Sequence, residues 1–179
     1  MNSRYFAAQA FAKNRHGNQK YGEFPYSVHL DAVAKLAEPF GLDAMIIAQL
    51  HDIIEDTDTS FNELAECFGF TIADAVNYVT DVKLEDRAKR KLEINQRLAA
   101  LNIEEEAARL ALIVKVCDRL ANVRSSSQSS PRHYKMYQNE HPAFKEAVYR
   151  PGLCDGLWKE LNALIIGQPE AILCKQATS

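Results

Sequence analysis

The sequence lacks the features of a membrane protein or a secreted protein. No apolar run approaches the ~20 consecutive residues that a membrane-spanning helix needs. Residues 1–17 mix Arg, Lys, Gln and Asn with short apolar pieces, so the apolar centre of a signal peptide is absent. These absences predict a cytoplasmic protein with no membrane partner.

Cysteine pairs and an excess of positive charge are also missing. The four cysteines are scattered and form no Cys-x-x-Cys pair, which argues against a zinc knuckle; they are Cys67, Cys117, Cys154 and Cys174. In a reducing compartment we expect them to be unpaired core or surface residues. The formal net charge of −3 disfavours nucleic acid as a partner, although a local basic pocket can still bind a nucleotide.

Helical spacing of apolar residues recurs along most of the chain, and strand patterns are hard to find. The sequence therefore predicts an all-α fold in one domain, residues 1–179, without internal repeats. A capping box at Ser60–Glu63 begins one short helix, which Gly69 ends. Asn102 begins a long helix that a serine-rich break, Ser125–Pro131, ends. The expected helices are 5–16, 29–40, 43–56, the short helix before Gly69, 72–81, 85–101, 104–124, 132–149 and 153–166.

Helix 43–56 carries polar groups that do not fit its apolar surroundings. Apolar residues cover most of its circumference, which predicts burial on nearly all sides. Its last turns nevertheless place His51, Asp52, Glu55 and Asp56 on one sector. Three acidic groups there repel one another, lose hydration and lie at the negative end of the helix dipole, and a bound cation removes all three penalties. The alternative is that Glu55 and Asp56 are solvated at a fraying helix end.

Helix 104–124 has a polar stripe beside its core-facing stripe. Lys115, Asp118, Arg119 and Asn122 recur at i, i+3, i+4 and i+7. In a functional interpretation they form a pocket wall with one metal-binding carboxylate, two cations for phosphate and one amide for a base or sugar. On this segment alone, an exposed helix face with a local Lys–Asp pair explains the stripe better.

The segment Lys20–His29 combines Gly, Pro and aromatic residues, which predicts an ordered loop that leads into a helix. His29 then lies at or near the first turn of that helix. Two histidines and two aspartates form a mixed nitrogen and oxygen ligand set that suits Mn²⁺, Fe²⁺ or Zn²⁺ with positions left for water. The candidate ligands are His29, His51, Asp52 and Asp118.

Taken together, these segments resemble the HD superfamily, and more narrowly the hydrolase domain of the RelA/SpoT type, which includes the small alarmone hydrolases. Order and spacing match from about residue 5 to 127, whereas the C-terminal helices 132–166 match only in being helical. The residues that carry the resemblance are Pro25–His29, Leu50–Thr57, Phe68–Gly69, Val79–Asp81 and Lys115–Arg124.

The resemblance implies a bundle of about eight to ten helices. It implies that His29, His51, Asp52 and Asp118 hold a metal, usually Mn²⁺, and that Glu55 and Asp56 handle the attacking water. Asn122, Arg124 and Ser125 match positions near the bound nucleotide. The implied reaction removes the 3′-pyrophosphate of guanosine tetra- or pentaphosphate, which gives GDP or GTP and pyrophosphate. Lys20, Lys115 and Arg119 can offset charge on the departing group.

Two departures concern the loop before His29. The family often has an adjacent Arg-Lys pair where this chain has Gln19-Lys20, and Leu30 stands where proline is common. The alternative function is therefore an HD phosphohydrolase that acts on another nucleotide, either an adenosine 3′-pyrophosphate analogue or a simple nucleoside phosphate. A silent nucleotide-binding module is disfavoured because no metal ligand is missing. The chain ends too soon for a synthetase domain, so we expect a degradative activity, and the oligomeric state is left open.

Overall fold

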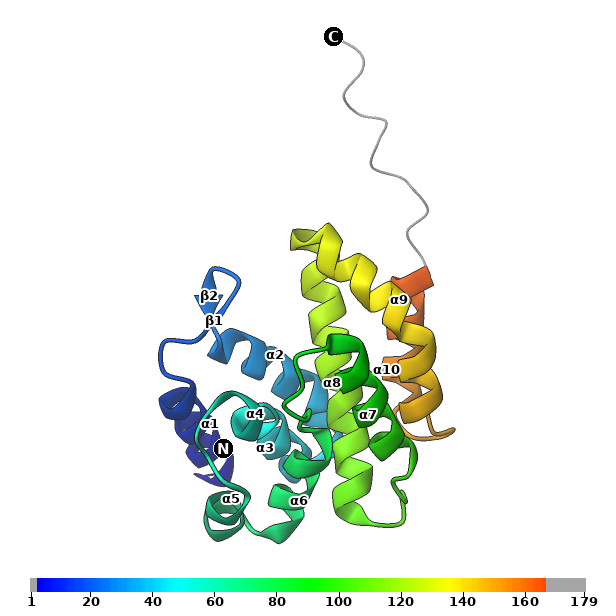
Figure 1. Cartoon of the computed structure of the whole chain (residues 1–179). Coiled ribbons are helices and arrows are strands. Elements are labelled where there is room, and N and C mark those ends of the chain that lie inside the picture. Colours follow the sequence, from blue (N-terminus) through cyan, green and yellow to red (C-terminus); the bar gives the residue numbers. More distant parts are fainter. Residues whose placement is uncertain (1–2, 167–179) are drawn as a thin grey trace.

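The computed structural model describes residues 3–166, which fold almost entirely into helices (Figure 1). The prediction of a helical bundle is confirmed, and no helix in this part of the chain is long and apolar enough to cross a membrane. The elements are α1 (Ser3–His16), β1 (Lys20–Tyr21), β2 (Phe24–Pro25), α2 (Ser27–Ala37), the 3-10 helix η1 (Glu38–Phe40), α3 (Leu42–Leu50), α4 (Ile53–Asp56), α5 (Phe61–Phe68), α6 (Phe70–Val79), α7 (Arg87–Ala99), α8 (Glu106–Ser129), α9 (Pro131–Val148) and α10 (Asp155–Ile166).

The long helix α8 is the centre of the bundle (Figure 1). It packs against α2, α3, α6, α9 and α10, and apolar side chains such as Leu112, Val116 and Leu120 are fully buried. Burial around most of the helix explains why its central turns carry so many apolar residues. One cluster of buried residues includes side chains from α1 to α10. That the whole chain, residues 1–179, is one domain stays a prediction, because the described part ends at residue 166.

The predicted helix 43–56 is interrupted where its polar residues begin. The helix α3 ends at Leu50, and α4 starts at Ile53 after Asp52, whose φ of −101° and ψ of 2° leave the helical region. The predicted burial is confirmed, because Ile47 and Leu50 are fully buried. The interruption is the physical reason that a single-helix prediction is wrong here: the backbone turns between the two pieces.

The serine-rich segment does not break α8, which continues to Ser129. Serine hydroxyls in this stretch donate to helical carbonyls, from Ser127 to Arg124 at 2.9 Å and from Ser129 to Ser125 at 2.8 Å. These bonds satisfy the hydroxyls, and packing of α8 against α9 and α10 outweighs the low helix propensity of serine. The predicted start is also shifted, because the Asn102 side chain accepts from the Glu104 amide in a turn before α8.

The predicted capping box is half formed. The Ser60 hydroxyl accepts from the Glu63 amide at 3.2 Å, but the Glu63 carboxylate pairs with Arg15 of α1. Gly69 ends α5 with a φ of 93°, which glycine adopts without strain. Among the described cysteines, Cys67 is exposed and free, whereas two are buried and free, namely Cys117 and Cys154. The fourth, Cys174, lies outside the described residues.

Candidate metal centre

Two histidines and two aspartates converge where α2, the α3–α4 junction and α8 meet. The Nε2 atom of His29 lies 3.2 Å from Oδ1 of Asp118 and 4.0 Å from Oδ2 of Asp52. The Nε2 atom of His51 lies 3.0 Å from Oδ2 of Asp52 and 3.7 Å from Oδ1 of Asp118. Ligand atoms of His29, His51 and Asp118 all lie within 4.8 Å of one another, which is compact enough to surround one metal ion.

The chemistry of this donor set fits a divalent cation. His51 donates from Nδ1 to the Ala48 carbonyl at 2.8 Å, so Nε2 is the ring nitrogen left to bind a metal ion. That Nε2 atom is buried and makes no hydrogen bond of its own. Burial opposes ionisation of Asp52 and Asp118, but the neighbouring imidazoles outweigh it and hold the pKa of both carboxyls below the usual range. Burial opposes protonation of His51, but Asp52 and Asp118 outweigh it and raise the pKa of His51 well above the usual 6.5, so a metal ion that binds Nε2 displaces a proton. Imidazole nitrogens and carboxylate oxygens together suit Mn²⁺, Fe²⁺ or Zn²⁺.

The segment before α2 orients the two carboxylates. The Tyr26 hydroxyl donates to Oδ2 of Asp52. The Tyr21 hydroxyl donates to Oδ1 of Asn122 at 2.9 Å, and Nδ2 of Asn122 donates to Oδ1 of Asp118 at 2.6 Å. The Tyr21 ring also stacks on the imidazole of His29, with centroids 4.7 Å apart. The sequence interpretation missed both tyrosines, although aromatic residues on either side of Gly22 and Pro25 were a signal.

The carboxylates of the predicted water-handling pair are both held by hydrogen bonds. Oε2 of Glu55 accepts from the Asp81 amide at 3.1 Å. Burial, then the charges of Asp81 and Asp52, raise the pKa of Glu55. Oδ2 of Asp56 accepts from Nε2 of Gln19 at 2.7 Å. The alternative of a solvated carboxylate is therefore wrong for Glu55, which is half-buried, whereas Asp56 is exposed at the last residue of α4 and that alternative stays open for it.

Lys115 and Lys91 share one buried carboxylate. Nζ of Lys115 donates to the Val79 carbonyl at 3.0 Å and lies 3.9 Å from Oδ1 of Asp81. Nζ of Lys91 donates to Oδ2 of Asp81 at 2.6 Å. The Asp81 side chain is only 5% exposed, so this is a buried charge cluster beside Glu55. Lys91 was missed because it lies on α7, outside every motif of the sequence.

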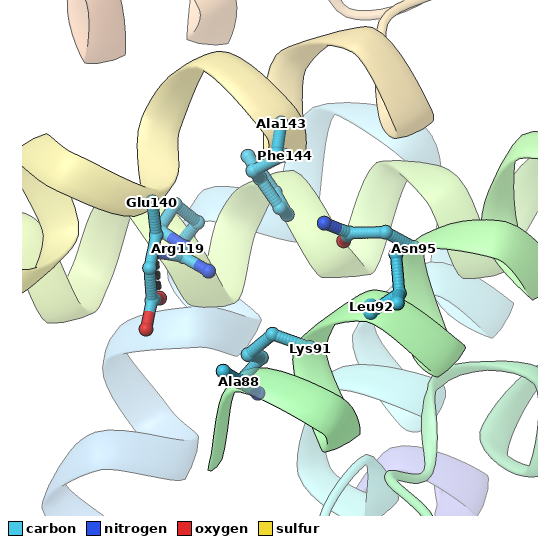
Figure 2. Close-up of a pocket in the computed structure, with 8 residues that line it drawn as sticks. All are labelled: Ala88, Lys91, Leu92, Asn95, Arg119, Glu140, Ala143 and Phe144. Carbon is cyan, nitrogen blue, oxygen red and sulfur yellow. Dashed lines mark hydrogen bonds and ion pairs between the residues drawn. The ribbon is translucent and has the colours of Figure 1, made fainter.

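Arg119 is buried against α9 and lines a pocket (Figure 2). Its Nη1 atom donates to Oε2 of Glu140 at 3.0 Å, and its guanidinium lies over the rings of Tyr137 and Phe144. Arg87 of α7 donates to the same carboxylate at 2.8 Å. The pocket encloses about 190 Å³ between α7, α8 and α9, and its lining residues are Ala88, Lys91, Leu92, Asn95, Arg119, Glu140, Ala143 and Phe144.

Two other predicted substrate residues, Lys20 and Arg124, have no hydrogen bond to the four predicted ligands among the described residues. Lys20 is exposed on β1. Arg124 donates to Glu160 of α10 at 2.7 Å. The structure thus places Glu55 and Asn122 close to the four predicted ligands. Asp56 is hydrogen-bonded to Gln19, in the loop before β1. The structure ties the predicted cations Lys115 and Arg119 to acceptors of the protein itself.

Comparison with known proteins gives the family. Residues 4–144 match the HD domain family. The guanosine-3′,5′-bis(diphosphate) 3′-pyrophosphohydrolase MESH1 of Danio rerio is 33% identical over 128 residues, which cover 68% of this chain and 68% of that protein. The chain belongs to the HD domain family.

A longer relative and a solved structure of similar length also match this chain. The guanosine-3′,5′-bis(diphosphate) 3′-pyrophosphohydrolase of Aquifex aeolicus is 39% identical over 123 residues, 66% of this chain, but the chain spans only 17% of that protein's length. A solved structure, described as a metazoan orthologue of SpoT that hydrolyses ppGpp, has a TM-score of 0.77 at 22% identity and covers 92% of this chain and 94% of that chain. These findings confirm the resemblance and the HD hydrolase fold that the sequence predicts.

Proposed function

We propose that this HD domain is a divalent-metal-dependent phosphohydrolase that removes the 3′-pyrophosphate of guanosine tetra- or pentaphosphate alarmones. One observation carries the proposal. The buried Nε2 atom of His51 makes no hydrogen bond, yet carboxylate oxygens of Asp52 and Asp118 lie 3.0 and 3.7 Å away. The name of the zebrafish relative, which matches over most of its length, supports the substrate.

The metal ligands in this proposal are His29, His51, Asp52 and Asp118, and the metal is Mn²⁺. When bound, a divalent cation supplies Lewis-acid chemistry, because it lowers the pKa of water and polarises a phosphoryl oxygen. The protein holds the ligands in place through the Ala48 carbonyl behind His51 and through the hydroxyl and amide groups that bond the two aspartates. Such supporting bonds fix which ring nitrogen and which carboxylate oxygen point inward.

Glu55 and Asp56 are the groups that orient the attacking water and accept its proton. Hydrolysis adds water across the bond between the ribose 3′ oxygen and the pyrophosphate, so a proton must leave the water as it attacks. The raised pKa of Glu55 makes its carboxylate a stronger base than an ordinary glutamate. The bond from the Asp81 amide keeps one carboxylate oxygen of Glu55 fixed.

A local excess of positive charge supports an anionic substrate. Glu140 lies between Arg87 and Arg119, which makes two cations and one carboxylate, although the whole chain carries a formal charge of −3. Around Asp81 the charges balance, because the cations of Lys91 and Lys115 are matched by the carboxylates of Asp81 and Glu55. Positive potential concentrated beside the site favours binding of a substrate with several phosphates and stabilises charge on the departing pyrophosphate.

The second candidate is hydrolysis of another nucleotide, as predicted from the loop before His29. In this loop Gln19 is bonded to Asp56, which leaves Lys20 as the single cation where the family often has two. Fewer cations in this loop favour a nucleotide with fewer phosphates, such as a simple nucleoside phosphate, and the changed loop residues allow a different base, as in an adenosine 3′-pyrophosphate.

Pyrophosphate and phosphate release from a nucleotide panel with Mn²⁺ tests both candidates. The panel holds guanosine and adenosine 3′-pyrophosphates beside ordinary nucleoside mono-, di- and triphosphates. We expect pyrophosphate release from guanosine 3′-pyrophosphates, its loss in Asp52→Ala, and its retention in Asp43→Ala, which removes only a surface pair with Arg4. Phosphate release from ordinary nucleotides would favour the second candidate, and no turnover by metal-loaded protein would contradict both.

A further inference from the structure

The side chain of Gln19 bridges a buried histidine and the predicted catalytic pair. Its Nε2 atom donates to Oδ2 of Asp56 at 2.7 Å, and its Oε1 atom lies 2.8 Å from Nδ1 of His16. The backbone of Gln19 is fixed as well, because its carbonyl accepts from the Tyr26 amide at 3.0 Å. The loop between α1 and β1 thus holds Asp56 through one side chain.

The chemistry of the two neighbours determines which way this amide faces. An ionised Asp56 only accepts, so Gln19 must present its NH₂ group to that carboxylate. The carbonyl oxygen of the amide then faces Nδ1 of His16, and this nitrogen must carry the proton. His16 therefore acts as a donor that prevents the Gln19 amide from turning over.

His16 is well placed for this role. It is 6% exposed and is the last residue of α1. Its ring packs against Tyr26, with centroids 4.7 Å apart, and the Tyr26 hydroxyl donates to Asp52. One rigid group of side chains consequently supports both a predicted metal ligand and, through Gln19, the carboxylate of Asp56.

We propose that Gln19 is a positioning residue that aims the Asp56 carboxylate at the attacking water, with its own orientation fixed by His16. This inference rests on the proposed function. Asp56 is exposed near the C-terminus of a four-residue helix, where its side chain has several rotamers to choose from. A fixed donor removes that freedom, and a misplacement of about 1 Å can cost about 100-fold in rate.

A double-mutant cycle on the Mn²⁺-loaded protein tests the inference. We expect Gln19→Ala to lower kcat about 10- to 100-fold with little change in KM, because positioning acts on the reacting geometry. In an Asp56→Ala background, the same substitution should cost less than about twofold, because no carboxylate remains to be positioned. Gln19→Met keeps the length of the side chain but lacks the hydrogen-bond donor, so its kcat should be as low as that of Gln19→Ala.

The matched control is Gln9→Ala, which removes a Gln–Asp bond of the same length between α1 and α2, to Asp31. It should keep the kcat of the wild type. Equal losses from Gln19→Ala in both backgrounds, a change confined to KM, or restoration by Gln19→Met would each overturn the inference.

A second measurement separates this inference from the proposed function. If the wild type turns over no nucleotide, the proposed function fails. The side-chain amide resonances of Gln19 in NMR spectra then test whether Gln19 contacts Asp56 and His16 in solution. We expect these resonances to shift in Asp56→Ala and in His16→Phe, which keeps the ring packing without Nδ1–H. Unchanged resonances in both variants would refute the contact itself.

Discussion

The Tyr21 hydroxyl donates a hydrogen bond of 2.9 Å to the Asn122 side chain, 101 residues further along the chain. Asn122 in turn orients Asp118, because its Nδ2 atom donates to Oδ1 of Asp118 at 2.6 Å. This is the same Asp118 oxygen that faces His29 and His51. The β1–β2 hairpin therefore fixes a carboxylate on α8 through a two-bond relay.

Substitution of Tyr21 by phenylalanine breaks this relay but keeps a ring to stack on His29. We expect Tyr21→Phe to weaken Mn²⁺ binding about tenfold, since the supporting partners of metal ligands are commonly worth 10- to 100-fold in affinity. Isothermal titration calorimetry measures the change. The control is Tyr5→Phe, which removes a tyrosine–amide bond of the same 2.9 Å length, to Gln49. Equal Mn²⁺ affinities for wild type and Tyr21→Phe would show that Asn122 orients Asp118 unaided.

Metal binding should stabilise the fold. A ligand at about 100 times its Kd adds about 2.7 kcal/mol, which raises Tm by about 5 to 10 °C for a chain of this size. We expect this rise for the wild type on addition of Mn²⁺ and its reversal by a chelator. Differential scanning calorimetry should show almost no rise for Asp118→Asn and the full rise for Asp43→Asn. A full rise in Asp118→Asn would exclude Asp118 as a ligand.

Arg119 has a structural role that can be separated from substrate binding. Its side chain is 8% exposed and contacts Glu140 and the rings of Tyr137 and Phe144. We expect Arg119→Ala to lower the free energy of unfolding by about 2 kcal/mol, because it removes the ring contacts and one charge-assisted hydrogen bond, while Arg87 still pairs with Glu140. In urea unfolding, Arg124→Ala should cost less than about 1 kcal/mol, since its pair with Glu160 is exposed. Unchanged stability together with a raised KM would instead assign Arg119 to the substrate.

Glu140 should make stability depend on pH. Burial opposes its ionisation, but hydrogen bonds and charge from Arg87 and Arg119 hold its pKa below the usual 4.5. Its contribution is therefore complete above about pH 4.5 and is lost as the pH falls through the lower folded-state pKa.

Glu140→Gln tests this dependence. At neutral pH, we expect the free energy of unfolding of the wild type to exceed that of the variant by about 1–2 kcal/mol. This value is modest because Arg87 is partly solvated, and solvent weakens its interaction with Glu140. In urea unfolding, this difference should shrink as the pH falls below the usual pKa of 4.5 and through the lower pKa of Glu140 in the folded protein. Glu146→Gln, on an exposed position of the same helix, should show no such trend. A difference that stays constant from neutral to acid would mean that the charge of Glu140 contributes nothing.

Most helices could be predicted from the sequence because they depend on local spacing, and the four candidate ligands, whose metal binding stays a prediction, were chosen from side-chain chemistry and family motifs. Apolar periodicity located α8, although burial around most of that helix leaves no single core-facing stripe beside Asp118. The family motifs then linked His29 to the His51-Asp52 doublet. The serine-rich end of α8 was predicted wrongly, because intrinsic propensity does not show that α9 and α10 will pack against this helix.

The partners of the polar groups could not be predicted, because they come from distant elements. Nothing near Arg119 in the sequence indicates Glu140, and nothing near Asp56 indicates Gln19 or His16. A polar stripe predicts that charges share a helix face, but only packing of α7 and α9 against α8 decides which acceptors they meet. Lys115 is an example, since a carbonyl and a carboxylate beyond its own helix hold it.

The interruption between α3 and α4 has a consequence for protein engineering. Neighbouring side chains on an unbroken helix point about 100° apart. At this junction, Asp52 leaves the helical region, and its carboxylate lies 3.0 Å from the imidazole of the adjacent His51. A designer who transplants the His-Asp doublet onto a straight helix would therefore obtain divergent ligands, and the bend must be transplanted with the two residues.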